Sequence, residues 1–222
     1  MAQLGWLIQL DKCTGCETCT VACKSENNTR PVGSPLPFKN GRGVIPDHVS
    51  YRWVVKIEEG TYPSPVLTFV TAACNHCQHP GCLASCPVSD PNDIYNPNNA
   101  IFKRREDGIV LINQTVCIGC RNCVQACPYG APQFNSATRK AEKCTFCVHR
   151  LYDVAGTRTG LLPACVTSCV GNAIQLVEDF QPADSGRNAP QSFSDHELTV
   201  PSTRFETGAP VVAGVPAAVA VA

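Results

Sequence analysis

Short apolar stretches separated by long polar segments dominate the pattern of this 222-residue chain. Bounded by Gly, Pro, Asn and Asp, these stretches predict short strands over residues 6–10, 51–57, 66–70, 101–104, 109–112 and 171–177. The Asp107-Gly108 turn predicts that 101–104 and 109–112 form a hairpin. We expect 51–57 and 66–70 to pair antiparallel, and 171–177 to lie beside 6–10.

The polar segments between these strands predict loops. Residues 24–50 and 88–100 are rich in Asn, Pro and Gly, and little regular structure is expected from Asp179 onward. The apolar stretch 211–222 is short and interrupted by Gly and Pro, which favours a flexible tail over a docking strand. No apolar run reaches 18 residues, so no membrane span is predicted, and the first ten residues lack the basic region of an export signal.

Cysteine usage changes this picture, because sixteen cysteines are far above ordinary composition. They form four cysteine groups: Cys13, Cys16, Cys19 and Cys23; Cys74, Cys77, Cys82 and Cys86; Cys117, Cys120, Cys123 and Cys127; and Cys144, Cys147, Cys165 and Cys169. The first and third groups share the spacing Cys-x2-Cys-x2-Cys-x3-Cys, which is an internal repeat. The middle gap is four residues in the second group and 17 in the fourth.

The repeated spacing is that of bacterial ferredoxins. Three thiolates wrapped round one corner bind three irons of a 4Fe–4S cluster, and the fourth thiolate ligates a different cluster. Zinc gains nothing from a third cysteine at the same step, and adjacent Cys-x2-Cys disulfides are mostly redox dithiols. His76 and His79 lie within the second group, whose cysteines already make a set of four. Hydrogen bonding of these histidines to a cluster is therefore favoured over ligation.

The exchange of last cysteines predicts which groups share a lobe. The second and third groups are separated only by a loop and a hairpin, which leaves the first and fourth to each other. We name the resulting sites by number. Site 1 is Cys13, Cys16 and Cys19 with Cys169; site 2 is Cys144, Cys147 and Cys165 with Cys23; site 3 is Cys74, Cys77 and Cys82 with Cys127; and site 4 is Cys117, Cys120 and Cys123 with Cys86.

These sites predict an α+β fold of two nested, tandem ferredoxin-like lobes, each a bacterial-type fold for two 4Fe–4S clusters, with short hairpins and long loops. The expected divisions are residues 1–50 with 140–180 for the first lobe, 66–139 for the second, 51–65 for a strand insertion, and 181–222 for an irregular extended tail. Small lobes poor in large apolar residues depend on their inorganic cores, so the chain without metal is expected to be largely unfolded.

Net charge bears on the partners. The formal charge is zero, so nucleic acid is not an expected partner. Four oxidised clusters with thiolate ligands, at roughly −2 each, would bring the loaded protein to roughly −8.

Beyond spacing, the residues around the cysteines resemble a family. The motifs are Cys13-Thr-Gly-Cys16, Ala22-Cys23-Lys24, Cys74-Asn-His-Cys77, Arg105-Glu-Asp-Gly108, Cys117-Ile-Gly-Cys120-Arg121, Ala126-Cys127-Pro128-Tyr-Gly-Ala-Pro-Gln133, Lys143-Cys144-Thr-Phe-Cys147 and Pro163-Ala-Cys165. Over residues 4–178 the chain resembles the iron–sulfur (B) subunits of dimethyl sulfoxide reductase and its polysulfide, thiosulfate and tetrathionate reductase relatives. Departures are the 17-residue gap, Val170 where many relatives have proline, and the tail.

The resemblance implies four 4Fe–4S clusters, paired in the nested way that spacing predicts. It implies a non-catalytic subunit of anaerobic respiration that relays electrons between a molybdenum- or tungsten-pterin catalytic subunit and an integral-membrane, quinone-reactive subunit. The chain would be membrane-associated through these partners, on either the periplasmic face, exported with its partner, or the cytoplasmic face. No catalytic constellation of its own is identified, so catalysis belongs to the partner.

Other functions remain open at this point. The same clusters would serve in the electron-transfer subunit of a hydrogenase, formate dehydrogenase or tungsten aldehyde oxidoreductase, or in a free polyferredoxin. A zinc-stabilised interaction module belongs to a different class, and colour separates it, because zinc protein is colourless and cluster protein is brown.

Overall fold

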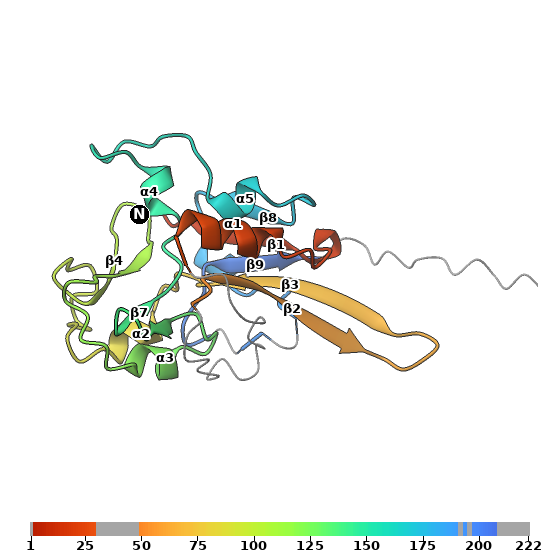
Figure 1. The fold of residues 1–222 in the computed structure, drawn as a ribbon, viewed down its shortest axis with the longest axis horizontal. Helices are drawn as coiled ribbons and strands as arrows, with labels where there is room; N and C mark the ends of the chain where they lie inside the picture. The colour runs from red at the N-terminus through yellow and green to blue at the C-terminus, as the bar shows by residue number, and fades with distance from the viewer. Residues whose placement is uncertain (1, 30–48, 191–192, 195–196, 208–222) are drawn as a thin grey trace, which may run out of the picture.

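The computed structural model describes residues 2–29, 49–190, 193–194 and 197–207. Most of the expected loop at 24–50 and the apolar stretch at 211–222 lie outside the described residues. The described chain is a mixed α/β fold with one long β-ribbon projecting from its body (Figure 1).

A three-stranded sheet lies at the centre of the molecule. Strand β1 (Gly5–Gln9) pairs antiparallel with β8 (Ile174–Val177) and parallel with β9 (Thr203–Glu206). The pairing of β1 with β8 confirms the predicted neighbours 6–10 and 171–177. Helix α1 (Thr18–Glu26) packs beside α5 (Ala164–Thr167), and Figure 1 shows both close to this sheet.

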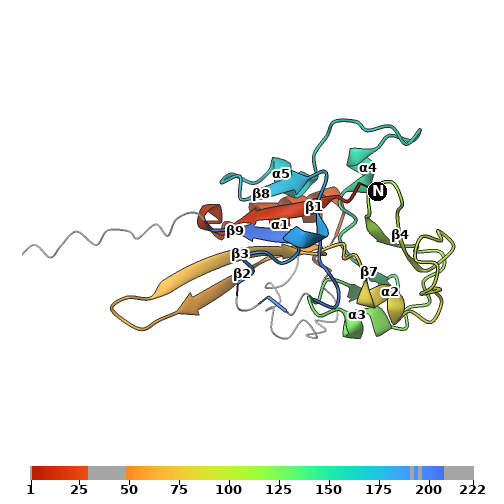
Figure 2. The same ribbon diagram turned by 180° about the vertical axis from the view of Figure 1, so that it is seen from behind.

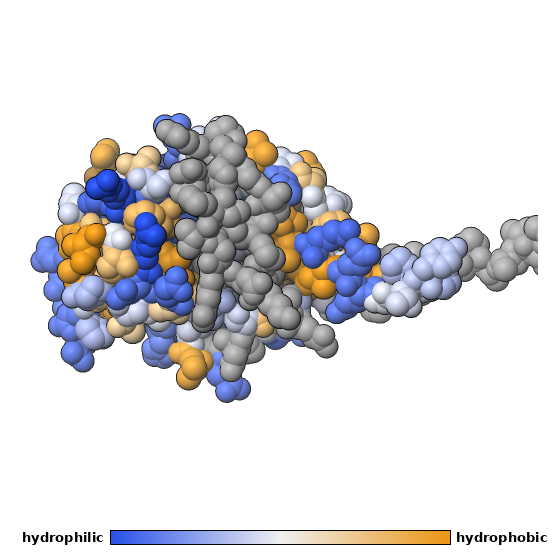
Figure 3. Space-filling view, turned by 60° about the horizontal axis from the view of Figure 1, so that its bottom comes forward, coloured by the Kyte–Doolittle hydropathy of each residue, from blue (hydrophilic) through white to orange (hydrophobic). Residues whose placement is uncertain are grey.

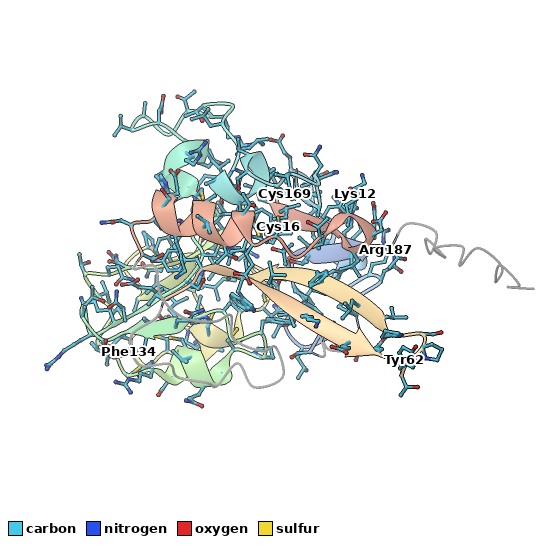
Figure 4. All side chains as sticks on the ribbon, turned by 45° about the vertical axis from the view of Figure 1, so that its right-hand side comes forward. Lys12, Cys16, Tyr62, Phe134, Cys169 and Arg187 are labelled. Carbon is cyan, nitrogen blue, oxygen red and sulfur yellow. The ribbon has the colours of Figure 1, made fainter. Side chains whose placement is uncertain are left out.

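The projecting ribbon consists of β2 (Arg52–Glu59) and β3 (Val66–Ala73), which pair antiparallel along their full length as predicted. Its base is buried, as at Trp53 and Val70, whereas Tyr62 at its far end is fully exposed. Figures 2 and 4 show the ribbon reaching past the sheet, with Tyr62 at its tip. The apolar alternation near the base therefore anchors an arm whose outer half is solvated.

Short elements make up the other end of the molecule. They are α2 (Gly81–Ala84), β4 (Ile101–Lys103), β5 (Val110–Ile112), α3 (Asn122–Ala126), β6 (Gln133–Asn135) and β7 (Lys140–Glu142). The predicted β4–β5 hairpin is confirmed. The β6–β7 hairpin was not expected, because its three-residue strands Gln-Phe-Asn and Lys-Ala-Glu carry little apolar signal. The remaining elements are η1 (Leu10–Lys12), α4 (Val148–Leu151) and η3 (Pro182–Asp184).

The expectation of an irregular tail from residue 181 is wrong for its described part. Strand β9 joins the central sheet, and the alternate side chains Thr203 and Phe205 are buried. The strand is only four residues long and lies among Ser, Pro and Thr, so its buried face depends on the partner strand and not on a local pattern. A smaller correction concerns residues 24–26, which continue α1 and do not begin a loop.

The main core lies between the sheet and the base of the ribbon. Trp6, Ile8, Val70, Phe146 and Phe205 are each at most 2% exposed. The rings of Trp6 and Phe146 stack with centroids 3.8 Å apart, so the first cysteine-bearing segment and the last one share this core.

A second, smaller core fills the end built by α2 and α3, around Leu83, Ile101 and Val124. Figure 3 shows hydrophobic and hydrophilic residues interspersed on the surface of this end. Among the described residues, no helix is both long and apolar enough to cross a membrane.

Candidate iron–sulfur centres

The first and third cysteine groups share a backbone conformation as well as a sequence spacing. Gly15 and Glu17 have φ of 71° and 58°, and Gly119 and Arg121 have φ of 74° and 68°. A helix starts at the next residue after Glu17 and after Arg121, so the two loops share their positive-φ positions and their helix start. The repeat in sequence is therefore a repeat in backbone conformation.

Glycine is required in both loops for space as well as for φ. A Cβ on Gly119 would lie 2.1 Å from the carbonyl oxygen of Arg139, and one on Gly15 would lie 2.5 Å from the Phe69 ring. The second and fourth groups have His76 (φ 44°) at the matching position and Phe146 (φ 60°). Both are fully buried, and this packing holds a conformation that non-glycine residues rarely adopt.

These loops direct backbone amides at cysteine sulfurs. The Phe146 amide donates to Cys144 Sγ at 3.3 Å, and the Ala173 amide donates to Cys169 Sγ at 3.2 Å. Successive N–H groups that converge on one side of a turn stabilise negative charge. Thiolate ligands are such charges, and amide hydrogen bonds to them are one way a protein sets a cluster's reduction potential.

The four cysteines of predicted site 3 line one cavity. Cys74, Cys77, Cys82 and Cys127 face it together, and the rest of its lining is mostly apolar, with Pro80, Gly81, Val110, Pro128, Tyr129, Ala131 and Pro132 among it. Burial raises the pKa of Cys82 well above its usual value, and the charge of Cys127 raises it further. The last cysteine of the third group thus lies with the first three of the second.

Site 4 is built at the contact between α2 and α3. The pKa of Cys123 is raised to about 12, first by burial and then by the charges of Cys117, Cys120 and Cys86. Nδ2 of Asn122 donates to a backbone carbonyl next to Cys86, at 3.4 Å, which ties the two helices together. Cys86 of the second group therefore lies near the cysteines of the third group, as the predicted exchange of last cysteines requires.

Site 1 gathers the first group with the end of the fourth. Burial raises the pKa of Cys13, and the Gly15 amide lowers it. The thiol charges that raise it further are those of Cys19, Cys169 and Cys16. The structure thus brings Cys169 to a group 146 positions or more earlier in the chain.

Site 2 gathers the fourth group with the end of the first. The pKa of Cys23 is raised to about 12, mainly by burial and then by the charges of Cys165 and Cys147, against a lowering by Arg52. The pKa of Cys144 is raised well above its usual value by burial, then by Cys23. All four cysteines are buried, so little water reaches the ligands of this site.

Electrostatic interactions between thiols of different sites show which sites are neighbours. Cys19 of site 1 acts on Cys23 of site 2, and Cys74 of site 3 acts on Cys144 of site 2. Sites 3 and 4 adjoin through the packing of α2 on α3. The four sets of thiols are therefore neighbours in the series 1, 2, 3, 4.

Aromatic side chains occupy the junction between sites 2 and 3. Phe146 stacks on Trp6 and also makes an edge-to-face contact with the His76 ring, with centroids 5.0 Å apart. The Trp6 Nε1–H donates to the carbonyl oxygen of Cys74 at 3.1 Å. All three rings are at most 2% exposed, so this column excludes water from the contact between the two ligand loops.

The two histidines of the second group differ in their surroundings. His76 is fully buried, and its Nδ1 accepts the Val110 amide at 3.1 Å. Burial holds the pKa of His76 well below its usual value, so the ring is neutral with its proton on Nε2. His79 is exposed, and its backbone amide donates to the carbonyl of Thr199. Hydrogen bonding from His76 to a cluster stays a prediction.

The thiols fit a cluster better than a single ion. All sixteen cysteines lie in the described part of the protein and are free. Yet within residues 2–29, 49–190, 193–194 and 197–207 no three metal-binding side chains converge closely enough for one metal ion. Zinc would draw four sulfurs to about 2.3 Å from one point, whereas a cubane spreads its four thiolates over its outer corners. Binding of iron would also convert these buried thiols to thiolates.

The sequence did not point to three buried cations around these sites. Arg52, Lys103 and Lys143 are each at most 4% exposed. Lys143 directly precedes Cys144, a predicted ligand, and this position was the available clue to a place near the site. Arg52 lies in the apolar strand signal Tyr51–Ile57, where a charged residue among buried ones was the available clue. Thr199, from the unexpected tail packing, lines the cavity of site 3.

These features define a ferredoxin-type iron–sulfur protein with cysteines for four 4Fe–4S clusters. Residues 65–179 match the family model described as a 4Fe–4S dicluster domain. The sequence is 34% identical to the B subunit of the sulfite dehydrogenase of Allochromatium vinosum, over 83% of this chain and 72% of that subunit. It is also 34% identical to the B chain of the anaerobic dimethyl sulfoxide reductase of Escherichia coli, over 83% and 76%. This chain is therefore a member of the family of iron–sulfur B subunits of the dimethyl sulfoxide reductase type.

A further relative is the B subunit of the tetrathionate reductase of Salmonella typhimurium, 43% identical over 175 residues. That match covers 79% of this chain and 57% of the relative, so the chain spans little more than half the length of this relative.

Proposed function

We propose that this chain is a non-catalytic subunit that relays electrons through four 4Fe–4S clusters. Its partners are a molybdenum- or tungsten-pterin catalytic subunit and an integral-membrane, quinone-reactive subunit. The relatives support this assignment, because they are named as B subunits of tetrathionate reductase and sulfite dehydrogenase and as the B chain of a dimethyl sulfoxide reductase. Association with the membrane is through these partners, on the periplasmic or the cytoplasmic face.

The order of the four sets of thiols carries the proposal. Each set has neighbours in the next, from site 1 through site 4, so bound clusters form a series and not separate storage sites. When bound, the clusters supply one-electron oxidation and reduction. The chain holds their ligands, excludes water with the column of Trp6 and Phe146, and donates backbone amides to ligand sulfurs.

The two ends of the series are the proposed points of exchange with partners. Cys16 of site 1 and Cys120 of site 4 are exposed, whereas every ligand of sites 2 and 3 is buried or half-buried. Exposed apolar side chains accompany both ends, with Val170 75% exposed beside Cys169 and Ile118 62% exposed beside Cys117. An exposed ligand with an apolar neighbour suits electron exchange across a protein interface.

The nested ligand sets imply two ferredoxin-like lobes. The first comprises residues 1–50 and 140–180, and the second comprises residues 66–139. Residues 51–65 are an insertion that contains β2, the first strand of the ribbon. Residues 181–222 form the tail after the first lobe. Contact between α1 and α5 supports the first lobe, and contact between α2 and α3 supports the second.

Anaerobic purification with native partners tests the function. The expected result is a brown complex with about sixteen iron and sixteen sulfide per copy of this chain. It should contain a large pterin subunit and a multi-span membrane subunit. Recovery of the chain alone, or with a hydrogenase, would contradict the assignment of partners.

Paired cysteine variants test the ligand sets. Cys169→Ala and Cys13→Ala are expected to abolish the same electron paramagnetic resonance (EPR) signal, while Cys165→Ala abolishes a different one. If Cys169→Ala and Cys165→Ala removed one common signal instead, the fourth group would hold its own cluster and the nested arrangement would be wrong.

A further inference from the structure

Arg52 is the most deeply buried cation of the described chain. It opens β2 and is 1% exposed, at the meeting point of the ribbon and the central sheet. Among the described residues no carboxylate lies within 4 Å of the Arg52 guanidinium. Six other arginines each form an ion pair with a carboxylate: Arg104, Arg105, Arg150, Arg158, Arg187 and Arg204. A buried charge without a counter-charge is costly, so the surroundings of Arg52 need an explanation.

Only part of the guanidinium is satisfied by the protein. Nη1 donates to Thr71 Oγ1 at 2.9 Å, and the plane lies over the Trp6 ring, 4.6 Å from its centroid. Nε and Nη2 are buried and have no hydrogen-bond partner in the described structure. Burial raises the pKa of the Cys165 thiol, whereas the charge of Arg52 and a hydrogen bond from Arg52 lower it, so the guanidinium faces a ligand sulfur of site 2.

The groups around this cation are ligand thiols from two sites. Thr71 Oγ1, which accepts from Arg52 Nη1, lies 3.5 Å from Cys19 Sγ of site 1. Burial lowers the pKa of Arg52, but the charges of the surrounding thiols, among them Cys165, Cys144 and Cys23 of site 2, raise it. Together these positions put the guanidinium between the two sites. The missing counter-charge is thus the negative charge that the two sites acquire when they are loaded.

We propose that Arg52 is the shared counter-charge of sites 1 and 2 and that it raises the reduction potentials of the clusters bound there. This inference rests on the proposed function, because it requires clusters at both sites. Each electron added to a cluster makes it more negative by one charge. A fixed cation in a poorly solvated interior stabilises that added charge, and it does so for both neighbours.

The two buried lysines differ from Arg52 in this respect. Lys103 Nζ donates to Gln3 Oε1 at 2.7 Å and to the Cys77 carbonyl at 3.0 Å, and Lys143 Nζ donates to the carbonyls of Val110 and Cys144. Both ammonium groups therefore donate hydrogen bonds to protein oxygens. Of the three, Arg52 is the one with two buried side-chain nitrogens that have no protein oxygen as acceptor, and it is a positioning residue through charge.

The test is a redox titration monitored by EPR on the anaerobically purified complex. In Arg52→Met the two clusters of sites 1 and 2 are expected to show at least a tenfold lower ratio of reduced to oxidised form at a fixed poise. A tenfold change corresponds to about 59 mV for one electron. The other two clusters should keep their potentials. Arg52→Lys, which keeps the charge, should restore most of the shift.

Arg158→Met is the matched control, because Arg158 is an exposed arginine paired with Glu178 and lies in the segment between Cys147 and Cys165. It should leave all four potentials unchanged. If Arg52→Met loses iron, Arg52→Gln is titrated in its place. Unchanged potentials in an iron-replete neutral variant, or loss of iron from Arg52→Lys as well as from both neutral variants, would overturn the inference. Wild-type protein with far fewer than about sixteen irons would instead overturn the proposed function.

Discussion

Sites 1 and 2 are held by more protein structure than sites 3 and 4. The first pair lies against α1, nine residues long, the three-stranded sheet and the base of the ribbon. The second pair lies among helices of four and five residues and hairpins with three-residue strands. Helices this short are not stable by themselves. The end with sites 3 and 4 therefore depends more on its bound metal than the sheet end does.

Removal of the clusters should have the largest effect of any change. Anaerobic chelation is expected to unfold most of the chain, since thiol ligands replace much of an apolar core. Backbone amides of 81–126 should lose protection from hydrogen exchange completely, while those of β1 and β8 retain some. Circular dichroism should show loss of most secondary structure. A cooperative melt of the metal-free chain would contradict this expectation.

The sheet end is best weakened through β9. Phe205 is 1% exposed and packs in the main core, so Phe205→Ala is expected to lower the free energy of unfolding by about 3–5 kcal/mol. The loss should be visible in denaturant unfolding of the loaded protein. Leu198→Ala is the control, because Leu198 is 84% exposed, and should change stability by less than about 0.5 kcal/mol. Equal effects of the two would mean that β9 contributes nothing.

The site 4 end is best weakened at Gly119. Alanine there combines a positive φ of 74° with a 2.1 Å approach to the Arg139 carbonyl, which is expected to cost about 2 kcal/mol or more. Iron content and EPR should show selective loss of the site 4 cluster. Gly156→Ala separates the two causes, because Gly156 has φ of 82° but nothing within 4 Å, and it should cost about 1 kcal/mol without loss of iron.

The smallest expected effect concerns the link between α1 and α4. A hydrogen bond from His149, followed by one from Arg150, lowers the pKa of Glu26. A lowered carboxyl pKa gives stability that is complete above the unfolded value, about 4.3, and is lost as pH falls through the folded value. At pH 7 the contribution is therefore present in full, but exposure and salt keep it below about 1 kcal/mol.

Hydrogen exchange of α4 in Glu26→Gln measures this link at pH 7. Protection should fall slightly, and the difference from wild type should shrink in high salt. Lys56→Gln, which breaks the exposed Lys56–Glu58 pair on the ribbon, is the control and should leave α4 unchanged. A Glu26→Gln effect that grows with salt would exclude an ionic origin.

The sequence pattern predicted those strands and that hairpin whose formation depends on residues close together in the chain. The strands at 6–10, 51–57, 66–70 and 171–177 and the Asp107-Gly108 hairpin formed as predicted, because alternation and turn residues act within a few positions. The glycines before Cys16 and Cys120 likewise fixed the two ligand loops, since only glycine fits their backbone.

The cysteine chemistry could be read from the chain alone, because the spacing of metal ligands is local in sequence. The place of Phe205 in the central sheet and that of Arg52 beside Thr71 and Cys19 became visible only in the folded protein. These arrangements depend on partners far away in sequence, for a four-residue strand and a lone buried arginine have no periodicity of their own. Long-range packing supplies their stability, and no local pattern encodes it.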